Sequence, residues 1–304
     1  MIKKILLFSC LIIFIPTFIV YFFIRDDEIT FNFSSNSTVR VYREQTQTID
    51  NVPIEEYVVG VVAGEMPISF SLEALKAQAV AARSYVMKQM ENNINKEYDV
   101  VDTVMNQVYL DKKYLQSVWS ESYVNNINKI KSAVLSTKGE YLSYDGKVAD
   151  ALFFSTSPGI TENSEDVFVS KLEYLRSVDS PWDSISPAYT STSTFTLEEF
   201  YNLLNIPYKE TLTIEIINTT KTGRIKKLKI NNTEFSGNEV CSILNLKSTY
   251  FEIAQEGMKV IIKNKGYGHG VGMSQYGAEG MSKEGYNYQD ILKHYYTNIE
   301  IKKF

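Results

Sequence analysis

The chain has 304 residues, enough for one large domain or two smaller ones, and 44% hydrophobic with 22% charged residues is typical of a globular protein. Its formal net charge is −5 and its isoelectric point is about 5.3, so a nucleic acid is not an expected partner. The 21 tyrosines would suit stacking on sugars, but we attribute most of them to ordinary core and surface packing.

An apolar segment lies close to the N-terminus. Lys3 and Lys4 precede residues 5–24, which contain no charge, and Arg25 follows them. Twenty apolar residues match the hydrocarbon core of a bilayer, and the basic flank predicts a cytoplasmic N-terminus with an exported body. A cleaved signal peptide would have a shorter apolar stretch and a small-residue cleavage site. Residues 1–25 are therefore predicted to be a cytoplasmic tip and a transmembrane signal anchor.

Cysteine and histidine are scarce in this chain. Cys10 lies in the apolar segment, so Cys241 is alone in the exported body and no intramolecular disulfide is expected there. With only His269 and His294, a zinc site built on Cys and His is not expected either. A site built on carboxylates stays open, but nothing requires one, and we expect no cofactor.

The first half of the body begins after a polar segment, residues 26–50, which is expected to be a stalk or an opening strand. The apolar run YVVGVVAGEMP (57–67) ends with Glu65, and burial of this charge would require pairing, protonation or a cleft. Residues 71–90 predict a helix, because apolar residues recur there every three or four positions. That face comprises Leu72, Leu75, Ala79, Ala82, Val86 and Met90.

A second helix is expected over residues 120–138, with Gly139 as its stop. A hairpin should follow, since Asp145 and Gly146 stand between two strand-like runs. The second of these runs leads into the hydroxyl-rich loop STSPGITENSED (155–166).

Residues 188–262 are expected to form a second lobe or an insertion in a body that spans 51–304. Thr196 and Glu199 have the spacing of a capping box before a short helix, and two strand-like runs follow. The chain returns to the body through the strand 259–265 and the glycine-rich GYGHGVG. Because helices and strands are mixed without strict βαβ alternation, we predict an α+β fold with antiparallel strands, in two lobes around a cleft.

Several motifs leave alternatives open when each is taken alone. GYGHGVG lacks the G-x-G-x-x-G spacing of dinucleotide sites, and a structural turn with a locally satisfied His269 is the simpler interpretation. The loop 155–166 could supply a serine nucleophile with His269 as base, a polar cradle for sugar hydroxyls, or only a surface connection. Arg83 and the segment DTVMNQVY (102–109) could equally be solvated.

Taken together, these segments are far more specific. GEMP with EALKAQAVAARSY, then DTVMNQVY, FFSTSPGITENSEDVF, SVDSPWD, and GYGHGVGMSQYGAEGM with ILKHYY follow one another in order. In this combination the chain resembles the SpoIID/LytB family over most of residues 51–187 and 263–304. Pro158 stands where relatives often have glycine. Some relatives place cysteines in that block and could hold zinc, whereas Ser157 and Glu162 here argue against a metal.

The resemblance implies a lytic transglycosylase of peptidoglycan. Such enzymes cut the MurNAc–GlcNAc β-1,4 bond of glycan strands that an amidase has stripped of peptides, and they leave 1,6-anhydro-MurNAc ends. Glu65 matches the catalytic acid of the family. The residues expected to line a glycan groove are Arg83, Gln107, Ser155, Thr156, Ser157, Thr161, Glu162, His269, Ser274, Gln275 and Tyr276.

A single carboxyl group is chemically sufficient for this reaction. Ordinary glycosidases use two carboxyl groups, but here the C6 hydroxyl of the muramyl residue replaces water as nucleophile. One glutamate can protonate the leaving oxygen and then accept the proton of that hydroxyl. Its pKa should be raised by apolar neighbours, and residues 58–63 and Met66 are suitable.

Two other functions stay open: a glycan-binding enhancer of a partner amidase without catalysis of its own, and a purely structural link between membrane and wall. The resemblance also implies an assembly with a sporulation amidase (SpoIIP-like) and a membrane localiser (SpoIIM-like), acting at the septum during engulfment of the forespore.

Overall fold

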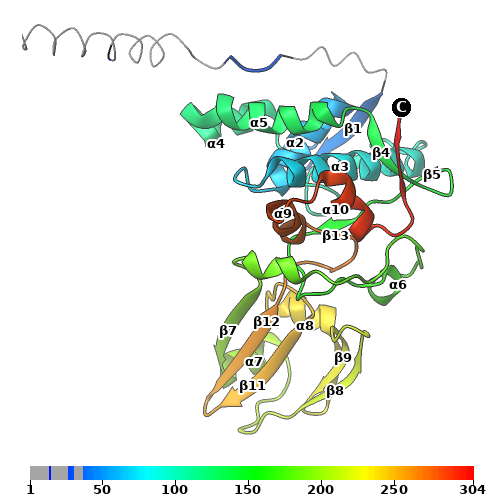
Figure 1. The fold of residues 1–304 in the computed structure, drawn as a ribbon. Helices are drawn as coiled ribbons and strands as arrows, with labels where there is room; N and C mark the ends of the chain where they lie inside the picture. Colours follow the sequence, from blue (N-terminus) through cyan, green and yellow to red (C-terminus); the bar gives the residue numbers. More distant parts are fainter. Residues whose placement is uncertain (1–13, 15–26, 31–36) are drawn as a thin grey trace, which may run out of the picture.

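The computed structural model describes residue 14 and residues 27–30 and 37–304 (Figure 1). The transmembrane helix predicted at 5–24 lies outside the described residues, apart from Phe14. Within the described part of the chain, no helix is both long and apolar enough to cross a membrane.

The body is a mixture of helices and mostly antiparallel strands, as the predicted α+β class requires. Its first four helices precede the predicted loop 155–166, and its last two follow the second lobe. The helices are α2 (Ile54–Glu65), α3 (Leu72–Asn92), α4 (Lys112–Trp119), α5 (Tyr123–Ser136), α6 (Ser164–Val167), α9 (Gln275–Lys283) and α10 (Tyr288–Tyr295), with short 3₁₀ segments η1 (Ser120–Ser122) and η2 (Pro181–Ile185).

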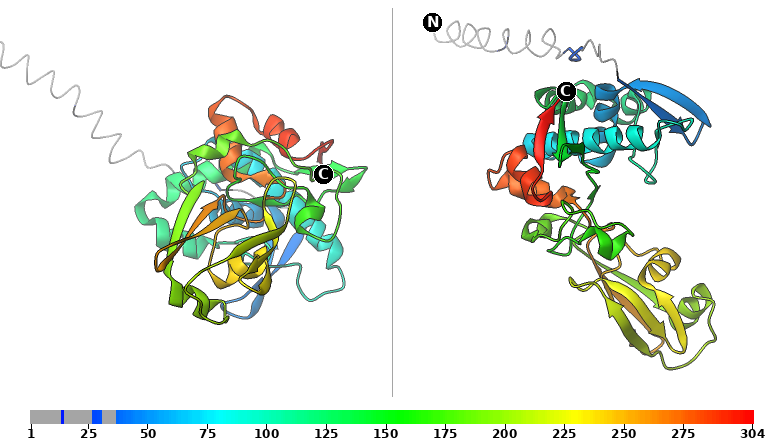
Figure 2. Two further views of the ribbon diagram at one scale, coloured as in Figure 1. Left: turned by 90° about the horizontal axis from the view of Figure 1, so that it is seen from below. Right: turned by 90° about the vertical axis from the view of Figure 1, so that its right-hand side faces the viewer.

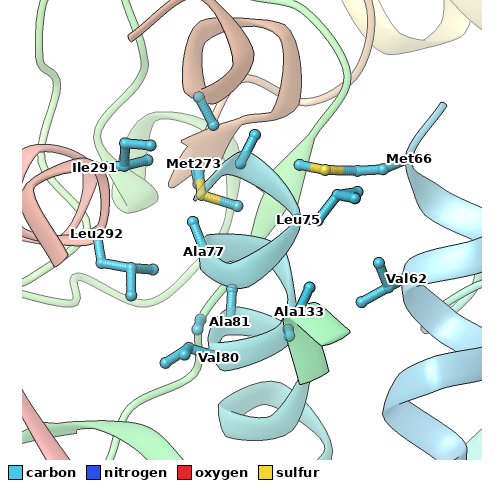
Figure 3. Packing of buried hydrophobic residues seen from close by; sticks show 14 of the residues in the cluster. Val62, Met66, Leu75, Ala77, Val80, Ala81, Ala133, Met273, Ile291 and Leu292 are labelled. Carbon is cyan, nitrogen blue, oxygen red and sulfur yellow. The ribbon is translucent and has the colours of Figure 1, made fainter. Parts of the chain in front are cut away.

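Helix α3 occupies the centre of the body. Figure 3 shows it between α2, which contributes Val62 and is followed by Met66, and α10, which contributes Ile291 and Leu292. The helix confirms the predicted element at 71–90, but the expectation of one apolar face was too narrow. Residues 74–86 are buried on nearly every side, and the alanines among them permit the close approach of several neighbours at once.

The N-terminal sheet of the body begins earlier than the sequence suggests. Strand β1 (Thr38–Arg43) pairs antiparallel with β2 (Thr48–Pro53) and parallel with β3 (Val100–Val101). Part of the expected stalk, 38–50, therefore belongs to this sheet. The physical reason is the burial of alternate apolar side chains, since Val39 and Val41 are fully enclosed.

The predicted hairpin is confirmed by β4 (Glu140–Tyr144) and β5 (Lys147–Val148), with β14 (Glu300–Lys303) as a third strand. Asp145 and Gly146 have φ values of 50° and 74°, as a two-residue hairpin turn requires. The second strand of this hairpin does not run unbroken into the loop 155–166, because β5 ends at Val148 and a separate short strand follows. Strand β6 (Phe153–Phe154) pairs parallel with β13 (Met273–Ser274), which brings the loop 155–166 next to the start of α9.

The second lobe has a hydrophobic core of its own, whose buried residues all lie between Leu197 and Ile262. Figures 1 and 2 show it at the end of the molecule opposite to α4 and α5. Thr196 and Glu199 form the predicted capping box at the start of α7. Its elements are β7 (Thr190–Thr196), α7 (Leu197–Leu203), β8 (Ile214–Thr219), β9 (Ile225–Ile230), β10 (Thr233–Ser236), α8 (Gly237–Ile243), β11 (Phe251–Glu256) and β12 (Lys259–Lys265), arranged in the sheets β10-β9-β8 and β11-β12-β7.

The helix predicted over 120–138 is present as α5 in a shorter form that ends at Ser136, and Gly139, three residues further on, has a φ of 77°. Helix α4 was not predicted. Its Asp111 N-cap accepts a hydrogen bond from the Tyr114 N–H at 2.8 Å, a signature that was present in the sequence.

Candidate active site

Glu65 is the last residue of α2 and is half-buried. Its Oε1 accepts a hydrogen bond from the backbone N–H of Val108 at 2.8 Å. Its Oε2 accepts one from the Gln275 side-chain amide at 3.3 Å. Three segments that are far apart in the sequence therefore meet at this carboxyl group.

Two glycines of α2 allow the segment that carries Val108 to approach the helix. A Cβ added to Gly64 would lie 2.6 Å from the Val108 carbonyl oxygen, closer than packed atoms approach one another. One turn earlier, the Gly60 carbonyl accepts a hydrogen bond from Leu110 N–H at 3.3 Å. The GVVAG spacing thus creates a flat helix face for this backbone segment, because residues four apart lie on the same side of a helix.

The environment of Glu65 favours its protonated form. Burial raises the pKa of Glu65, and the hydrogen bonds from Val108 and Gln275 only partly oppose this effect. Val58, Val62 and Met66 are themselves buried, and their contact with the carboxyl group stays a prediction. A glutamate in this state can act as a general acid near neutral pH and still has two donors for its ionised form.

The residues before Val108 are held by tyrosines of α2 and α3. Tyr57 donates a hydrogen bond to Gln107 Oε1 at 3.1 Å, and Asn106 Nδ2 donates to Tyr85 Oη at 2.9 Å. Burial raises the pKa of both phenols, and the charge of Glu65 adds to this rise. Gln107, predicted as a glycan contact, is fully buried and positions the backbone that binds Glu65.

Gln275 is positioned by the start of α9. Ser274, the N-cap of this helix, accepts a hydrogen bond from Gly277 N–H at 3.3 Å and donates one to the Asp183 carboxylate. Tyr276 is tied to the loop 155–166, since its N–H donates to the Ser155 carbonyl at 3.1 Å. Of the predicted glycan contacts, Gln275 is the one that the structure brings to Glu65.

Asp183 is a buried carboxylate that the sequence analysis did not single out, although the SVDSPWD block contains it. It accepts hydrogen bonds from Ser157 N–H at 2.7 Å and Ser157 Oγ at 2.8 Å, and from Ser180 Oγ at 2.5 Å. Together with the bond from Ser274, these contacts join the loop 155–166 to η2 and α9. Burial raises the pKa of Asp183, and the four donors partly oppose that rise.

The hydroxyl-rich loop is built into the interior rather than displayed on the surface. Thr156, Ser157 and Thr161 are fully buried. Thr156 Oγ1 bonds to Ser186 Oγ at 2.7 Å, and Thr161 Oγ1 accepts from Val178 N–H at 2.9 Å. In this conformation these side chains stabilise the loop, so their contact with a glycan stays a prediction.

Glu162 joins the body to the second lobe. Its Oε1 lies 3.4 Å from Arg224 Nε and accepts hydrogen bonds from Thr220 at 3.3 Å and from Thr222. Glu162 Oε2 and both Nε and Nη2 of Arg224 are buried without a hydrogen-bond partner. Burial raises the pKa of Glu162 to about 7, against the opposing charge of Arg224.

His269 is satisfied locally, as the simpler interpretation of GYGHGVG predicts. Its Nε2 lies 3.0 Å from the Phe153 carbonyl, and its Nδ1 accepts from Val271 N–H at 3.1 Å. Burial lowers the pKa of His269 to about 4, and Arg224 adds to this effect. With both ring nitrogens engaged, His269 is not placed as a base for a serine of the loop.

Arg83 lies in the interior of the body and not on a solvated face. Its guanidinium forms a two-point ion pair with the Glu55 carboxylate, with bonds of 3.0 and 2.6 Å, and donates to the Glu140 carbonyl at 2.9 Å. Its role as a glycan contact stays a prediction. Within residues 27–30 and 37–304, no group of three or more His, Cys, Asp or Glu side chains is arranged to hold a metal ion.

Comparison with known proteins gives consistent matches. A family model described as "SpoIID: Stage II sporulation protein" matches residues 42–144. The Stage II sporulation protein D of Bacillus amyloliquefaciens is 43% identical over 271 residues, which is 88% of this chain and 79% of that protein. The protein of the same name from Bacillus subtilis is 42% identical over 89% of this chain and 80% of its own length. The Amidase enhancer of Bacillus subtilis is 30% identical over 81% of this chain but only 40% of its own length.

Proposed function

The chain belongs to the SpoIID family of stage II sporulation proteins, and from this membership we propose that it is a lytic transglycosylase of peptidoglycan. The proposed substrate is a glycan strand without stem peptides, cut at the MurNAc–GlcNAc β-1,4 bond. The proposed catalytic residue is Glu65. The single observation that supports it most is the setting of this carboxyl group: half-buried, raised in pKa, and held by Val108 and Gln275.

The proposed reaction balances with one carboxyl group. Protonated Glu65 donates its proton to the glycosidic oxygen as the bond from this oxygen to C1 of MurNAc breaks. The C6 hydroxyl of the same MurNAc attacks C1, and the carboxylate of Glu65 accepts the hydroxyl proton. No water is consumed, and Glu65 is protonated again at the end. A second carboxylate to activate water, which an inverting glycosidase needs, has no place in this scheme.

The two hydrogen-bond donors suit both halves of this cycle. Burial favours the neutral acid before proton transfer, and the Val108 N–H and the Gln275 amide stabilise the carboxylate that exists between the two steps. The backbone donor is fixed by α2 through Gly64, so it does not need to be reoriented during the reaction. Burial, which the two donors only partly oppose, raises the pKa of the acid toward neutrality, where general acid catalysis is most effective.

The decisive experiment incubates the full-length protein with peptide-free glycan strands and identifies the new ends by mass spectrometry. Anhydro-MurNAc ends from the wild type, reduced roughly 100- to 10,000-fold by Glu65→Gln, are expected for loss of a general acid. Glu56→Gln is the matched control, because Glu56 lies exposed on the same helix. Reducing ends would indicate hydrolysis instead, and equal rates in wild type and Glu65→Gln would exclude Glu65 as the acid.

A second candidate function is stimulation of a partner amidase without catalysis by this chain. The observation that favours it is the similarity to a protein named Amidase enhancer. In this case the isolated protein leaves glycan strands uncut, and Glu65→Ala still stimulates an amidase. The two functions are separated by the same glycan digest, run with and without the amidase.

The cellular setting is also a proposal. We place the N-terminus in the cytoplasm, one transmembrane helix at residues 5–24, and the body outside the cytoplasm in the septal space during sporulation. A sporulation amidase (SpoIIP-like) would supply the stripped strands, and a membrane localiser (SpoIIM-like) would hold both enzymes at the septum. Alkaline extraction of membranes from sporulating cells tests the anchor, because a protein with a membrane span stays in the pellet.

A further inference from the structure

Residues 27–30 are bound to helix α5 by backbone contacts. Asn128 Oδ1 accepts a hydrogen bond from Ile29 N–H at 2.8 Å, and Asn128 Nδ2 donates one to the Asp27 carbonyl at 3.0 Å. Lys131 Nζ donates to the Ile29 carbonyl at 2.7 Å. The short segment is thus held on both sides of Glu28 by side chains that are one helical turn apart on α5.

The Glu28 side chain adds two ion pairs to these contacts. Its carboxylate lies 2.7 Å from Lys131 Nζ and 2.9 Å from Lys112 Nζ, which belongs to α4. Tyr123 also donates to it, at 3.3 Å. We call residues 27–30 and these partners on α4 and α5 the staple. Because it combines backbone and side-chain contacts to two helices, it fixes both the position and the direction of the chain where it enters the body.

The staple lies very close in sequence to the predicted membrane anchor. Only Arg25 and Asp26 separate the end of the apolar run 5–24 from Asp27. Three steps of fully extended chain cover at most about 10 Å, and the headgroup region on one side of a bilayer is about 6 Å thick. Asn128 must therefore lie at or just above the membrane surface when the anchor is inserted.

The exposed side of α4 has a composition that suits the membrane–water interface. Tyr114 and Val118, one turn apart, are 52% and 57% exposed, and Tyr at the level of the headgroups is favourable. Two of the four lysines in residues 112–136 are paired with Glu28, and Lys113 lies exposed on α4. Basic side chains near a membrane surface are attracted by anionic lipids. We call the exposed side of α4 with Tyr114 and Val118 the α4 face.

We propose that the staple holds the body on the outer surface of the membrane, with the α4 face against phospholipid headgroups and the second lobe directed away from the bilayer. The inference rests on the proposed anchor but not on the proposed catalysis. Figures 1 and 2 show the geometry that carries it, since α4 and α5 lie at one end of the molecule and β8 and β9 at the other. The orientation would set the second lobe, rather than the helices, toward the wall.

The test uses the full-length protein in vesicles of phosphatidylethanolamine and phosphatidylglycerol, with Cys10 and Cys241 replaced by serine. A fluorescent label is attached at Val118→Cys or, as the distal control, at Ile216→Cys in β8, where Ile216 is 46% exposed. Lipids with a spin label on the headgroup quench nearby fluorophores. Quenching severalfold stronger at position 118 than at 216 is expected, and equal quenching at both positions would overturn the orientation.

The staple is tested in the same assay by the double variant Glu28→Gln/Asn128→Ala, which removes both ion pairs and the two hydrogen bonds from Asn128 to the backbone. Quenching at position 118 should fall toward the value at 216, whereas Glu121→Gln, which removes an exposed charge from the same end of the molecule, should leave it unchanged. Equal quenching in wild type and in the double variant Glu28→Gln/Asn128→Ala would exclude the staple as the orienting device. Alkaline extraction of the labelled protein separates the failures: release from the vesicles overturns the anchor and this orientation together, while anhydro-MurNAc formation, assayed in parallel, reports on catalysis alone.

Discussion

Replacement of Arg83 by methionine is expected to destabilise the body strongly, because the guanidinium is enclosed completely. Arg83 is 0% exposed and Glu55 is 2% exposed, and two hydrogen bonds of 3.0 and 2.6 Å join them. In Arg83→Met the Glu55 carboxylate keeps only the Gly139 N–H, at 3.1 Å, as a donor in the described contacts. The free-energy cost arises because a buried carboxylate is left without its partner, and not because the attraction itself is lost.

The magnitude follows from the burial of both partners. Removal of one partner of a buried ion pair typically costs about 3–5 kcal/mol. We therefore expect Arg83→Met to lose about 4 kcal/mol of unfolding free energy, a large part of the stability of a typical domain.

Equilibrium unfolding in urea, followed by tryptophan fluorescence, measures this loss directly. Both tryptophans, Trp119 and Trp182, lie in the body, so the signal reports the body separately from the second lobe. Lys88→Met is the matched control on α3, because the pair of Lys88 with Glu91 is exposed and should contribute less than about 1 kcal/mol.

The double variant Glu55→Leu/Arg83→Met should recover most of the loss, since it leaves no uncompensated charge in the interior. An Arg83→Met protein within about 1 kcal/mol of the wild type in unfolding free energy, but unable to bind glycan strands, would refute this reasoning. It would indicate that Arg83 contacts the substrate, as the sequence analysis predicts.

Three further outcomes are expected. In Gly64→Ala the new Cβ would lie 2.6 Å from the Val108 carbonyl oxygen. We therefore expect urea unfolding to show a loss of about 1–3 kcal/mol in unfolding free energy, together with weaker glycan cleavage. Unchanged cleavage would contradict the role of the Val108 donor. Burial raises the pKa of Glu162 to about 7, so the stability that protonated Glu162 contributes is complete below the ordinary glutamate range and is lost as pH rises through 7. Glu162→Gln should remove this decline in unfolding free energy. An unaltered pH dependence of unfolding in Glu162→Gln would contradict this reasoning. Burial raises the pKa of Glu65, so cleavage should decline with rising pH at a higher pH than an exposed glutamate of pKa about 4.3 would allow; a rate profile governed by that ordinary value would exclude the buried acid.

Much of the local structure follows from the sequence alone. The spacing of apolar residues predicts α3, because a helix places every third or fourth residue on one side. The Asp145–Gly146 pair predicts the hairpin turn, and the Thr196/Glu199 pair predicts the start of α7. In each case the interacting groups are within four residues of one another, so the pattern of neighbours contains the physical cause. Glu65 also stands out in the sequence, as a charge that ends an apolar run.

The tertiary structure alone decided what surrounds these residues. Glu65 is bound by Val108 and Gln275, which are 43 and 210 positions away in the sequence, and Asp183 collects donors from the loop 155–166 and from α9. The charge of Arg83 gives no indication in the sequence of whether its helix faces water or the interior. Hydrogen bonds between distant segments depend on how whole elements pack, and burial, which sets the pKa of Glu65, is a property of that packing and not of any local pattern.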